Sequence, residues 1–295
     1  MADVPSATFV KLFNVMPALI SVIVTTYNWP EALELVLSSL LLQKDEHFEV
    51  VIADDGSKAA TREMIEEFSS RAPFPIKHYW QEDQGFRPAR CRNGAVSLSD
   101  GEYLVFADGD CCLLSDFVSK HRGLMADGEM VTGKRSFLKK RFTQFVLKGG
   151  MAIYSWPRLV WFFLGLFGGC NRPVQFLPIP QSDAQRKRIP REWQNAQTCN
   201  LAVWRKDFLK VDGFDASYEN HGLEDSDFIL RIIRSGIIRK TADYTSPVLH
   251  LYHGRGKADQ SDTEGLNPKR FSALLDDTER YVPLIGYADS HSETE

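Results

Sequence analysis

The sequence predicts an α/β fold in which helices flank a mostly parallel central sheet. Three observations lead to this prediction. Apolar, β-branched runs alternate with stretches of helical periodicity over about the first hundred residues, the connections between them are short, and three of the runs end in polar side chains. Alternation of strands and helices with short connections is typical of a parallel sheet. Ligands bind such sheets at the carboxyl ends of the strands, so the polar ends indicate a candidate site.

The individual elements follow in order along the chain. ALISVIVTTYN, residues 18–28, is an apolar, β-branched run, as expected for a strand covered on both faces. A helix is predicted from Pro30, because proline is favoured in a first helical turn and leucines follow at helical spacing. The remaining predicted elements are a strand at 48–57, a polar helix at 59–70, a strand at 75–80, a helix at 89–98 and a strand at 102–110.

Composition and charge exclude several other classes of protein. The chain has 295 residues, 43% of them hydrophobic, which suffices for one large domain or two closely packed lobes. Its net charge of −4 gives no indication of a nucleic-acid partner. Five cysteines without a C-x-x-C pair predict neither a disulfide framework nor a zinc site, and the N-terminus lacks a signal-peptide pattern. We therefore expect a protein of the reducing cytoplasm.

Three predicted strands end in polar residues, at 25–28, 54–57 and 108–110. A single acidic turn is ordinary, since Asp and Gly are common turn residues. Three polar ends that converge on one edge of a sheet predict a site instead. Asp108 and Asp110, in the sequence D-G-D, offer carboxylate oxygens of the kind that hard divalent cations prefer. No glycine-rich nucleotide loop of the G-x-G-x-x-G or G-x-x-x-x-G-K-[ST] type is present, so we expect phosphate to be held by metal and basic side chains.

The segments VIVTTYN, ADDGS, RNGA and FADGD, in this order, closely resemble family 2 glycosyltransferases of the GT-A fold over about residues 19–125. The later segment GFDASYENHGLEDSDFILRIIRSG, residues 213–236, is similar to the C-terminal module of β-1,4-galactosyltransferases and bacterial chondroitin-polymerase-like enzymes. The resemblance implies one nucleotide-sugar domain merged with an acceptor-binding region. It further implies inverting, metal-dependent transfer of a hexose or N-acetylhexosamine from a UDP-sugar to a hydroxyl of a glycan acceptor.

The resemblance also implies roles on the donor side. Asp108 and Asp110 would be the D-x-D motif that holds Mn(II) or Mg(II) on the diphosphate, with Asp108 also near the nucleotide sugar. Asp55 would contact the uracil or ribose, with Asp54 as its neighbour. The other implied donor-binding residues are Thr26, Tyr27, Arg87, Arg90, Arg92 and Asn93. A guanidinium suits phosphate because its planar fork donates two parallel hydrogen bonds, although at least one of the three arginines is expected to be a solvated helix residue.

On the acceptor side, the resemblance makes Asp225 the general base and Glu224 the acceptor ligand. Asp227 is interpreted as a helix-start residue, since acids are favoured there. His253 matches the metal-binding histidine of the galactosyltransferases better than His250 does, and an imidazole beside carboxylates suits Mn(II). His47, His78 and His121 are given structural roles, and the Gly-rich residues 254–265 are expected to form a lid.

The middle of the chain is strongly basic. Residues 134–191 carry twelve basic side chains and one acid, a net charge of +11 that leaves −15 for the rest. The basic residues are Lys134, Arg135, Lys139, Lys140, Arg141, Lys148, Arg158, Arg172, Arg186, Lys187, Arg188 and Arg191. The uncharged run 159–170 is too short to span a bilayer, which needs ~20 residues, and is interpreted either as a buried helix or as a membrane-interface segment. Anionic lipid head groups or lipopolysaccharide phosphates would suit the basic clusters, so we expect a lipid-linked acceptor and peripheral binding to the cytoplasmic face of the inner membrane.

Two other functions remain open at this point. One is a sugar-nucleotide nucleotidyltransferase, although such enzymes usually carry a Gly-rich loop where this chain has Thr-Thr-Tyr-Asn-Trp. The other is a non-catalytic scaffold that binds nucleotide sugar or membrane. The expected divisions of the chain are an N-terminal extension (1–18), a nucleotide-sugar region (19–125), a basic and aromatic insertion (126–195), an acceptor and catalytic-base region (196–285) and a C-terminal tail (286–295).

Overall fold

The computed structural model describes residues 17–220, 222–254 and 265–289. Within these ranges a seven-stranded sheet has the order β3-β2-β1-β4-β8-β6-β9, and a small sheet has the order β5-β10-β7. The strands are β1 (Ile20–Thr26), β2 (Phe48–Asp54), β3 (Ile76–Trp80), β4 (Tyr103–Asp108), β5 (Cys111–Leu113), β6 (Glu129–Thr132), β7 (Arg135–Phe137), β8 (Asn200–Trp204), β9 (Ile238–Thr241) and β10 (Val248–His250).

The sheet is mixed but mostly parallel, which confirms the predicted fold class. Strands β1, β2, β3 and β4 are parallel to one another in the expected places, whereas β8 runs antiparallel to β4 and β6. The register places Thr25 beside Asp108 and Thr26 beside Asp54. The polar ends of three strands therefore meet at one edge of the sheet.

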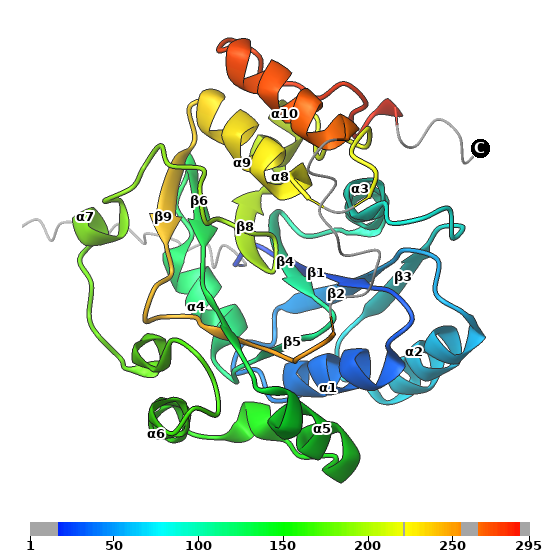
Figure 1. Ribbon diagram of the computed structural model, residues 1–295, viewed down its shortest axis with the longest axis vertical. Helices are drawn as coiled ribbons and strands as arrows, with labels where there is room; N and C mark the ends of the chain where they lie inside the picture. The colour runs from blue at the N-terminus through cyan, green and yellow to red at the C-terminus, as the bar shows by residue number, and fades with distance from the viewer. Residues whose placement is uncertain (1–16, 221, 255–264, 290–295) are drawn as a thin grey trace, which may run out of the picture.

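Helices cover both faces of the large sheet (Figure 1). In the first half of the chain they are α1 (Pro30–Leu40), α2 (Ala59–Arg71), α3 (Pro88–Leu98) and α4 (Phe117–Leu124). Later come α5 (Lys140–Gly149), α6 (Arg158–Leu166), α7 (Asp183–Arg186), α8 (Arg205–Lys210), α9 (Glu224–Arg234) and α10 (Leu266–Asp276), with short 3₁₀ turns at Ile153–Ser155 and Pro173–Phe176. Helices α1 and α2 lie on one side of the sheet, α3, α8 and α9 lie on the other, and α10 packs on α9 (Figure 1).

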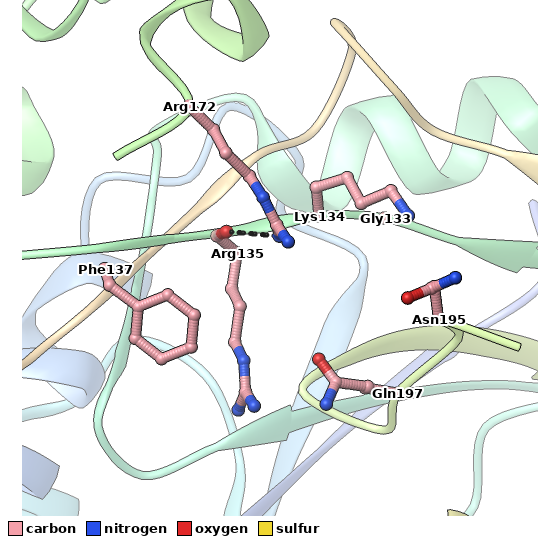
Figure 2. Close-up of a pocket in the computed structure, with 7 residues that line it drawn as sticks. All are labelled: Gly133, Lys134, Arg135, Phe137, Arg172, Asn195 and Gln197. Carbon is pink, nitrogen blue, oxygen red and sulfur yellow. Dashed lines mark hydrogen bonds between the residues drawn. The ribbon is translucent and has the colours of Figure 1, made fainter. Parts of the chain in front are cut away.

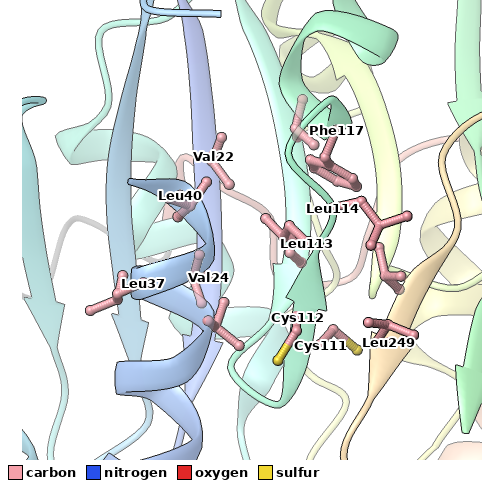
Figure 3. Packing of buried hydrophobic residues seen from close by; sticks show 14 of the residues in the cluster. Val22, Val24, Leu37, Leu40, Cys111, Cys112, Leu113, Leu114, Phe117 and Leu249 are labelled. Carbon is pink, nitrogen blue, oxygen red and sulfur yellow. The ribbon is translucent and has the colours of Figure 1, made fainter. Parts of the chain in front are cut away.

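Two hydrophobic cores explain why the first strand is apolar without a break. Val22 and Val24 pack with α1, while Ile23, between them in sequence, packs into the opposite core with α3, α8 and α9. Figure 3 shows Val22 and Val24 beside Leu37 and Leu40 of α1 and the small sheet. Complete burial of a Val or Leu side chain is worth about 1.5–3 kcal/mol, so both faces of the strand contribute to stability.

The nucleotide-sugar region and the later segments form one continuous sheet. Strand β8 pairs with β4 from Tyr103 to Ala107, and β6, from the predicted basic insertion, pairs with both β8 and β9. The predicted lid lies outside the described residues except for its two terminal glycines, and the N-terminal extension lies outside them up to residue 16. The described part of the C-terminal tail contacts the body, where Tyr287 N donates to Asp212 O (2.8 Å).

The apolar segment 159–170 is neither wholly core nor wholly surface. Trp161 is 0% exposed and packs against Trp156 and Phe176, whereas Phe163 is 54% and Phe167 89% exposed. No helix in the described part of the chain has both the length and the apolar character needed to cross a membrane. The sequence pattern could not separate the two interpretations because the same helix carries both faces.

Candidate active site

A cleft of about 1130 Å³ opens at the carboxyl edge of the large sheet. It lies between the ends of β1 and β4, the start of α9, and the segment that follows β10. Its polar lining includes Thr25, Thr26, Asp55, Arg92, Asp108, Asp110, Arg135, Gln197, Thr198, Glu224, Asp225, His250 and His253. Both acidic motifs of the sequence therefore face one space.

The D-G-D segment is held tightly against β1. Thr25 Oγ1 donates to Asp108 Oδ1 (3.2 Å), and Gly109 N donates to Thr25 O (2.7 Å). A Cβ at Gly109 would lie 2.6 Å from Thr25 O, so any other residue would push the turn away from the strand. The glycine thus lets the two carboxylates project from a turn packed on the sheet edge.

Two histidines approach the second carboxylate of this motif. His250 Nε2 and His253 Nε2 each lie 3.5 Å from Asp110 Oδ2. His250 is buried and its Nδ1 lies 2.6 Å from Leu251 O, a contact that assigns the proton to Nδ1 and leaves Nε2 directed at Asp110. His253 is 43% exposed at its side chain. The sequence favoured His253 alone, but the structure brings both imidazoles to the same carboxylate.

These groups fit a divalent cation. Carboxylate oxygen and neutral imidazole nitrogen are a donor set that Mn(II) accepts. Asp110, His250 and the thiol of Cys111 also lie close enough together to share an ion, but a thiol is a soft ligand that suits Mn(II) or Mg(II) poorly.

Arg92 joins the two acidic motifs. The side chain is buried, with Nη1 3.3 Å from Asp225 Oδ1 and 3.6 Å from Glu224 Oε1, and Nη2 3.8 Å from Asp108 Oδ1. Burial by itself would lower the pKa of Arg92, but the carboxylates of Asp225, Glu224 and Asp108 outweigh it and the pKa is raised. A permanent cation therefore lies between the strand-end and helix-start carboxylates.

The E-D pair begins α9 in a fixed orientation. Leu223, just before it, has φ +75, an unusual conformation for a branched residue that turns the chain into the helix. Thr198 donates to both oxygens of Asp225, from N (3.1 Å) and from Oγ1 (2.8 Å). Burial raises the pKa of Glu224 to about 7, the nearby charge of Asp225 adds to the rise, and Arg92 opposes it.

On the other side of the cleft, the polar ends of β1 and β2 form a second group. Asp55 is buried and accepts hydrogen bonds from Arg87 N (2.7 Å) and Gln81 Nε2, while burial raises its pKa. Thr26 lines the cleft beside it, and the half-exposed Tyr27 donates its hydroxyl to Asp83 (2.9 Å). The cleft thus has room and polar groups for a nucleotide at this end.

Four of the residues predicted to bind the donor do not line the cleft. Asp54 is fully buried and turns inward to Ser57 N (2.8 Å) and His78 Nε2 (3.1 Å), so it orders the loop after β2. The Arg87 guanidinium binds Gln84 and the Glu82 carbonyl, and Asn93 makes two hydrogen bonds to the backbone of Phe214. Arg90 is likewise absent from the described lining. Sequence spacing places these side chains near the sheet edge but does not decide their direction.

Two cleft residues were missed or given a different role, and Asp227 lies in the first turn of α9, as predicted. Arg135 Nη1 lies 3.7 Å from Asp108 Oδ2, although the sequence showed it only as part of a basic segment. Thr198, which orients Asp225, lies in QNAQTCN, where no pattern indicates a site. Asp227 is buried and ion-paired with Arg231 (2.6 Å), away from the cleft lining. A helical i, i+4 pairing could have indicated that last contact.

Comparison with protein families matches two segments of the chain. Residues 21–175 match the model of glycosyl transferase family 2, and residues 180–254 match a model described as the N-terminal domain of galactosyltransferase. The first match contains the D-G-D segment and the second contains the E-D pair. The two motifs that share the cleft thus come from two adjacent family matches.

Curated relatives and solved structures agree with these matches. The chain is 28% identical over 232 residues to validoxylamine A glucosyltransferase of Streptomyces hygroscopicus subsp. jinggangensis (strain 5008), covering 74% of this chain and 52% of the relative. It is 24% identical over 274 residues to chondroitin synthase of Escherichia coli, and the match covers 87% of this chain and 38% of the synthase. The structure of GalNAc-T7 with UDP, GalNAc and Mn²⁺ superposes with a TM-score of 0.60 at 17% identity. The superposition covers 88% of this chain and 48% of GalNAc-T7. The chain thus spans about half the length of the glucosyltransferase, and the structural likeness establishes a GT-A fold.

Proposed function

This chain belongs to glycosyl transferase family 2, and we propose that it transfers a hexose or N-acetylhexosamine from a UDP-sugar to a glycan hydroxyl with inversion. The observation that carries the proposal is the convergence of Asp108, Asp110, Glu224 and Asp225 on one cleft, with Arg92 between the two pairs. An inverting transfer needs a leaving-group site and a base on opposite sides of one reacting carbon. Two acidic groups from different elements that face the same space are compatible with that requirement.

The leaving-group side is assigned to the D-G-D segment. Asp108, Asp110, His250 and His253 would hold Mn(II) or Mg(II), which when bound supplies positive charge to the diphosphate oxygens. GalNAc-T7 was crystallised with UDP and Mn²⁺, which supports a divalent metal and a uridine donor by analogy. Arg135, 3.7 Å from Asp108, supplies a further cation on this side. Asp55 and Thr26 are assigned to the nucleoside, since they line the end of the cleft formed by β1 and β2.

The base is assigned to Asp225. Thr198 and Arg92 fix its carboxylate by three hydrogen bonds, so its orientation is set before substrate binds. In the proposed step Asp225 takes the proton of the acceptor hydroxyl, the acceptor oxygen forms a bond to the anomeric carbon, and the bond from that carbon to the diphosphate oxygen breaks. UDP leaves and the proton remains on Asp225. Glu224, buried beside it, is assigned to a hydroxyl of the acceptor sugar.

We further propose that the acceptor is lipid-linked and that the protein docks peripherally on an anionic membrane. The exposed residues of α6 are apolar, namely Leu159, Val160, Phe163 and Leu166, and the exposed Phe167 follows directly after the helix. The adjoining helix α5 contacts α6 through the Phe142–Trp161 ring pair. It exposes Arg141, Phe145 and Lys148 along one face. Apolar side chains beside cations suit the interface of an anionic bilayer.

The transferase proposal is tested by UDP release and product formation from a panel of UDP-sugars with Mn(II) present. Asp108→Asn and Asp225→Asn should each lower turnover at least about 100-fold, whereas the matched surface variant Glu63→Gln on α2 should retain it. Full turnover of wild-type protein in excess chelator would contradict the proposed dependence on a divalent metal. Failure of UDP to bind in the presence of Mn(II) would remove the donor, and steady pyrophosphate release from UTP and a sugar 1-phosphate would favour nucleotidyl transfer instead.

A further inference from the structure

A second pocket, of about 250 Å³, adjoins the cleft beside β7. It is lined by Gly133, Lys134, Arg135, Phe137, Arg172, Asn195 and Gln197, and we call it the basic pocket. Arg135, Phe137, Asn195 and Gln197 also line the cleft, so the two spaces are continuous. Figure 2 shows the side chains of Arg135 and Arg172 and the amides of Asn195 and Gln197 around this pocket.

Positive charge dominates the basic pocket. Three of its seven lining residues are cationic and none is acidic. Burial lowers the pKa of Lys134; Asp243 opposes the change, but the nearby cations Arg239, Arg172 and Arg188 add to it. Arg135 Nε is buried and has no hydrogen-bond partner among the residues the structure describes. Cations that repel one another and a donor that lacks an acceptor both indicate that an anion belongs here.

The backbone at two of these residues is also unusual. Arg172 has φ +53 and Asn195 has φ +60, in the left-handed region, which is unfavourable for arginine but tolerated by asparagine. Arg172 Nη1 nevertheless donates to Arg135 O (3.1 Å), which fixes the guanidinium over the pocket. Strained conformations of the kind seen at Arg172 cluster at ligand sites, which supports binding as the role of the pocket.

The remaining lining groups suit a sugar. The residue Phe137 is 37% exposed, and its ring centroid lies 4.9 Å from the guanidinium carbon of Arg135, so apolar surface adjoins the cations of the pocket. The amides of Asn195 and Gln197 can donate to and accept from hydroxyl groups. Gln197 immediately precedes Thr198, which holds the base Asp225 (2.8 Å). The pocket therefore lies next to the place assigned to the acceptor hydroxyl.

We propose that the basic pocket binds a carboxylate or phosphate group carried by the acceptor saccharide. The acceptor is then an acidic glycan, held by Lys134 and Arg172 while its hydroxyl faces Asp225. This inference rests on the proposed transferase function, because it places the acceptor relative to that base. Carboxylate and phosphate share the same recognition by guanidinium and ammonium groups, and the experiment separates them.

The test titrates the full chain, saturated with UDP and Mn(II), with three probes followed by NMR: methyl glucuronide, glucose 6-phosphate and neutral methyl glucoside. At least one acidic probe should bind at least about tenfold more tightly than the neutral one. Lys134→Gln and Arg172→Gln should each weaken that binding about tenfold, since each removes one charge-assisted contact worth roughly 1.5 kcal/mol. The matched control Lys120→Gln, on α4 outside the lining of both pockets, should leave it unchanged.

Three results would overturn the inference: equal binding of neutral and acidic probes, binding that neither variant weakens, or binding of the acidic probe that occurs without UDP and is lost when the protein is saturated with UDP. The last result would assign the pocket to the donor diphosphate. UDP binding is measured separately in each variant, so the two proposals can fail independently. Absence of UDP binding would contradict the transferase proposal, whereas normal UDP binding without selectivity for acidic probes would contradict only the acidic acceptor.

Discussion

The cleft and the basic segment, residues 134–191, differ in where their charged side chains point and what they pair with. In the cleft, carboxylates from β4 and α9 converge on a common space around Arg92. In the basic segment, many cations are used inside the fold: Lys187 pairs with Glu129 and Asp183, and Arg188 with Asp243 (2.8 Å). The cluster 186–188 is therefore a weaker candidate for lipid than its sequence suggested. A run of like charges in the sequence gives only the number of charged residues. Their ion-pair partners in the structure show whether those charges are free to bind a ligand.

Arg158 and Arg186 follow the same rule. Arg158 binds Asp116 (3.0 Å), and Arg186 donates to Thr241 O (3.2 Å) and Thr245 Oγ1 (2.7 Å). By contrast, Lys139, Lys140, Arg141 and Lys148 are exposed at α5, beside the apolar face of α6. In Figure 1, α7 lies beside β9, well away from α5 and α6. Only the α5 cluster is thus placed to act together with that apolar face.

The largest expected effect tests the role of the cleft. Asp225→Asn should lower the transfer rate about 10²–10⁴-fold, because an amide cannot accept the acceptor proton. UDP affinity in the presence of Mn(II) should stay within twofold of wild type, since Asp225 is assigned to the acceptor side. An assay of UDP release measures the transfer rate, and titration with UDP measures the affinity. A variant that keeps a tenth or more of wild-type activity would show that Asp225 is not the base.

The next effect compares the two histidines beside Asp110. Asp110→Asn should weaken Mn(II) binding at least about tenfold, as measured by the electron paramagnetic resonance of free Mn(II). His250→Ala and His253→Ala distinguish their contributions, and we expect both to weaken binding because both lie 3.5 Å from Asp110. The variant His47→Ala serves as the control. Unchanged Mn(II) affinity in all three cleft variants would place the metal elsewhere.

A smaller effect separates the two basic clusters. Changing Phe163 and Phe167 to Ser, or Arg141 and Lys148 to Gln, should reduce binding to phosphatidylglycerol liposomes about tenfold with little change in melting temperature. Binding should also weaken as salt is raised. Lys187→Gln should instead leave liposome binding unchanged and lower the melting temperature, because it removes a partner of the buried Glu129. Weaker liposome binding in Lys187→Gln, with unchanged binding in the α5 and α6 variants, would contradict this assignment of the two clusters.

The smallest expected effect is on stability and follows from Glu224. Its pKa is raised from 4.5 to about 7 in the folded protein, so the folded state disfavours the charged form. Below pH 4.5 Glu224 is protonated in both the folded and the unfolded chain and its contribution to stability is fully present. As the pH rises from about 4.5 through 7, the unfolded chain loses this proton more readily than the folded protein, so the contribution is lost. Glu224→Gln carries no charge and should raise the melting temperature at pH 8 by about 2 °C or more. The gain should vanish near pH 4.5, and a lower melting temperature at pH 8 would contradict the prediction.

Much of the first half of the fold followed from local pattern. Continuous apolar strands, helices at leucine spacing and polar strand ends are consequences of burial on two faces, so β1 to β4 and α1 to α3 lie where expected. The D-G-D and E-D motifs likewise indicated which carboxylates face the cleft. The second half offered no such alternation, and the pairing of β8 with β4 in the opposite direction was not predictable from its own residues.

What the sequence alone determined was the fold class, the family, and the two acidic motifs, because each depends on residues close together in the chain. Only the tertiary structure decided which side chains face the cleft. Asp54 and Asn93 turn inward to backbone groups, and Arg135 turns toward Asp108 although its neighbours in sequence suggested another role. The direction of a side chain depends on the hydrogen-bond partners that distant segments bring to it, and those segments meet only when the sheet closes around β4 and β8.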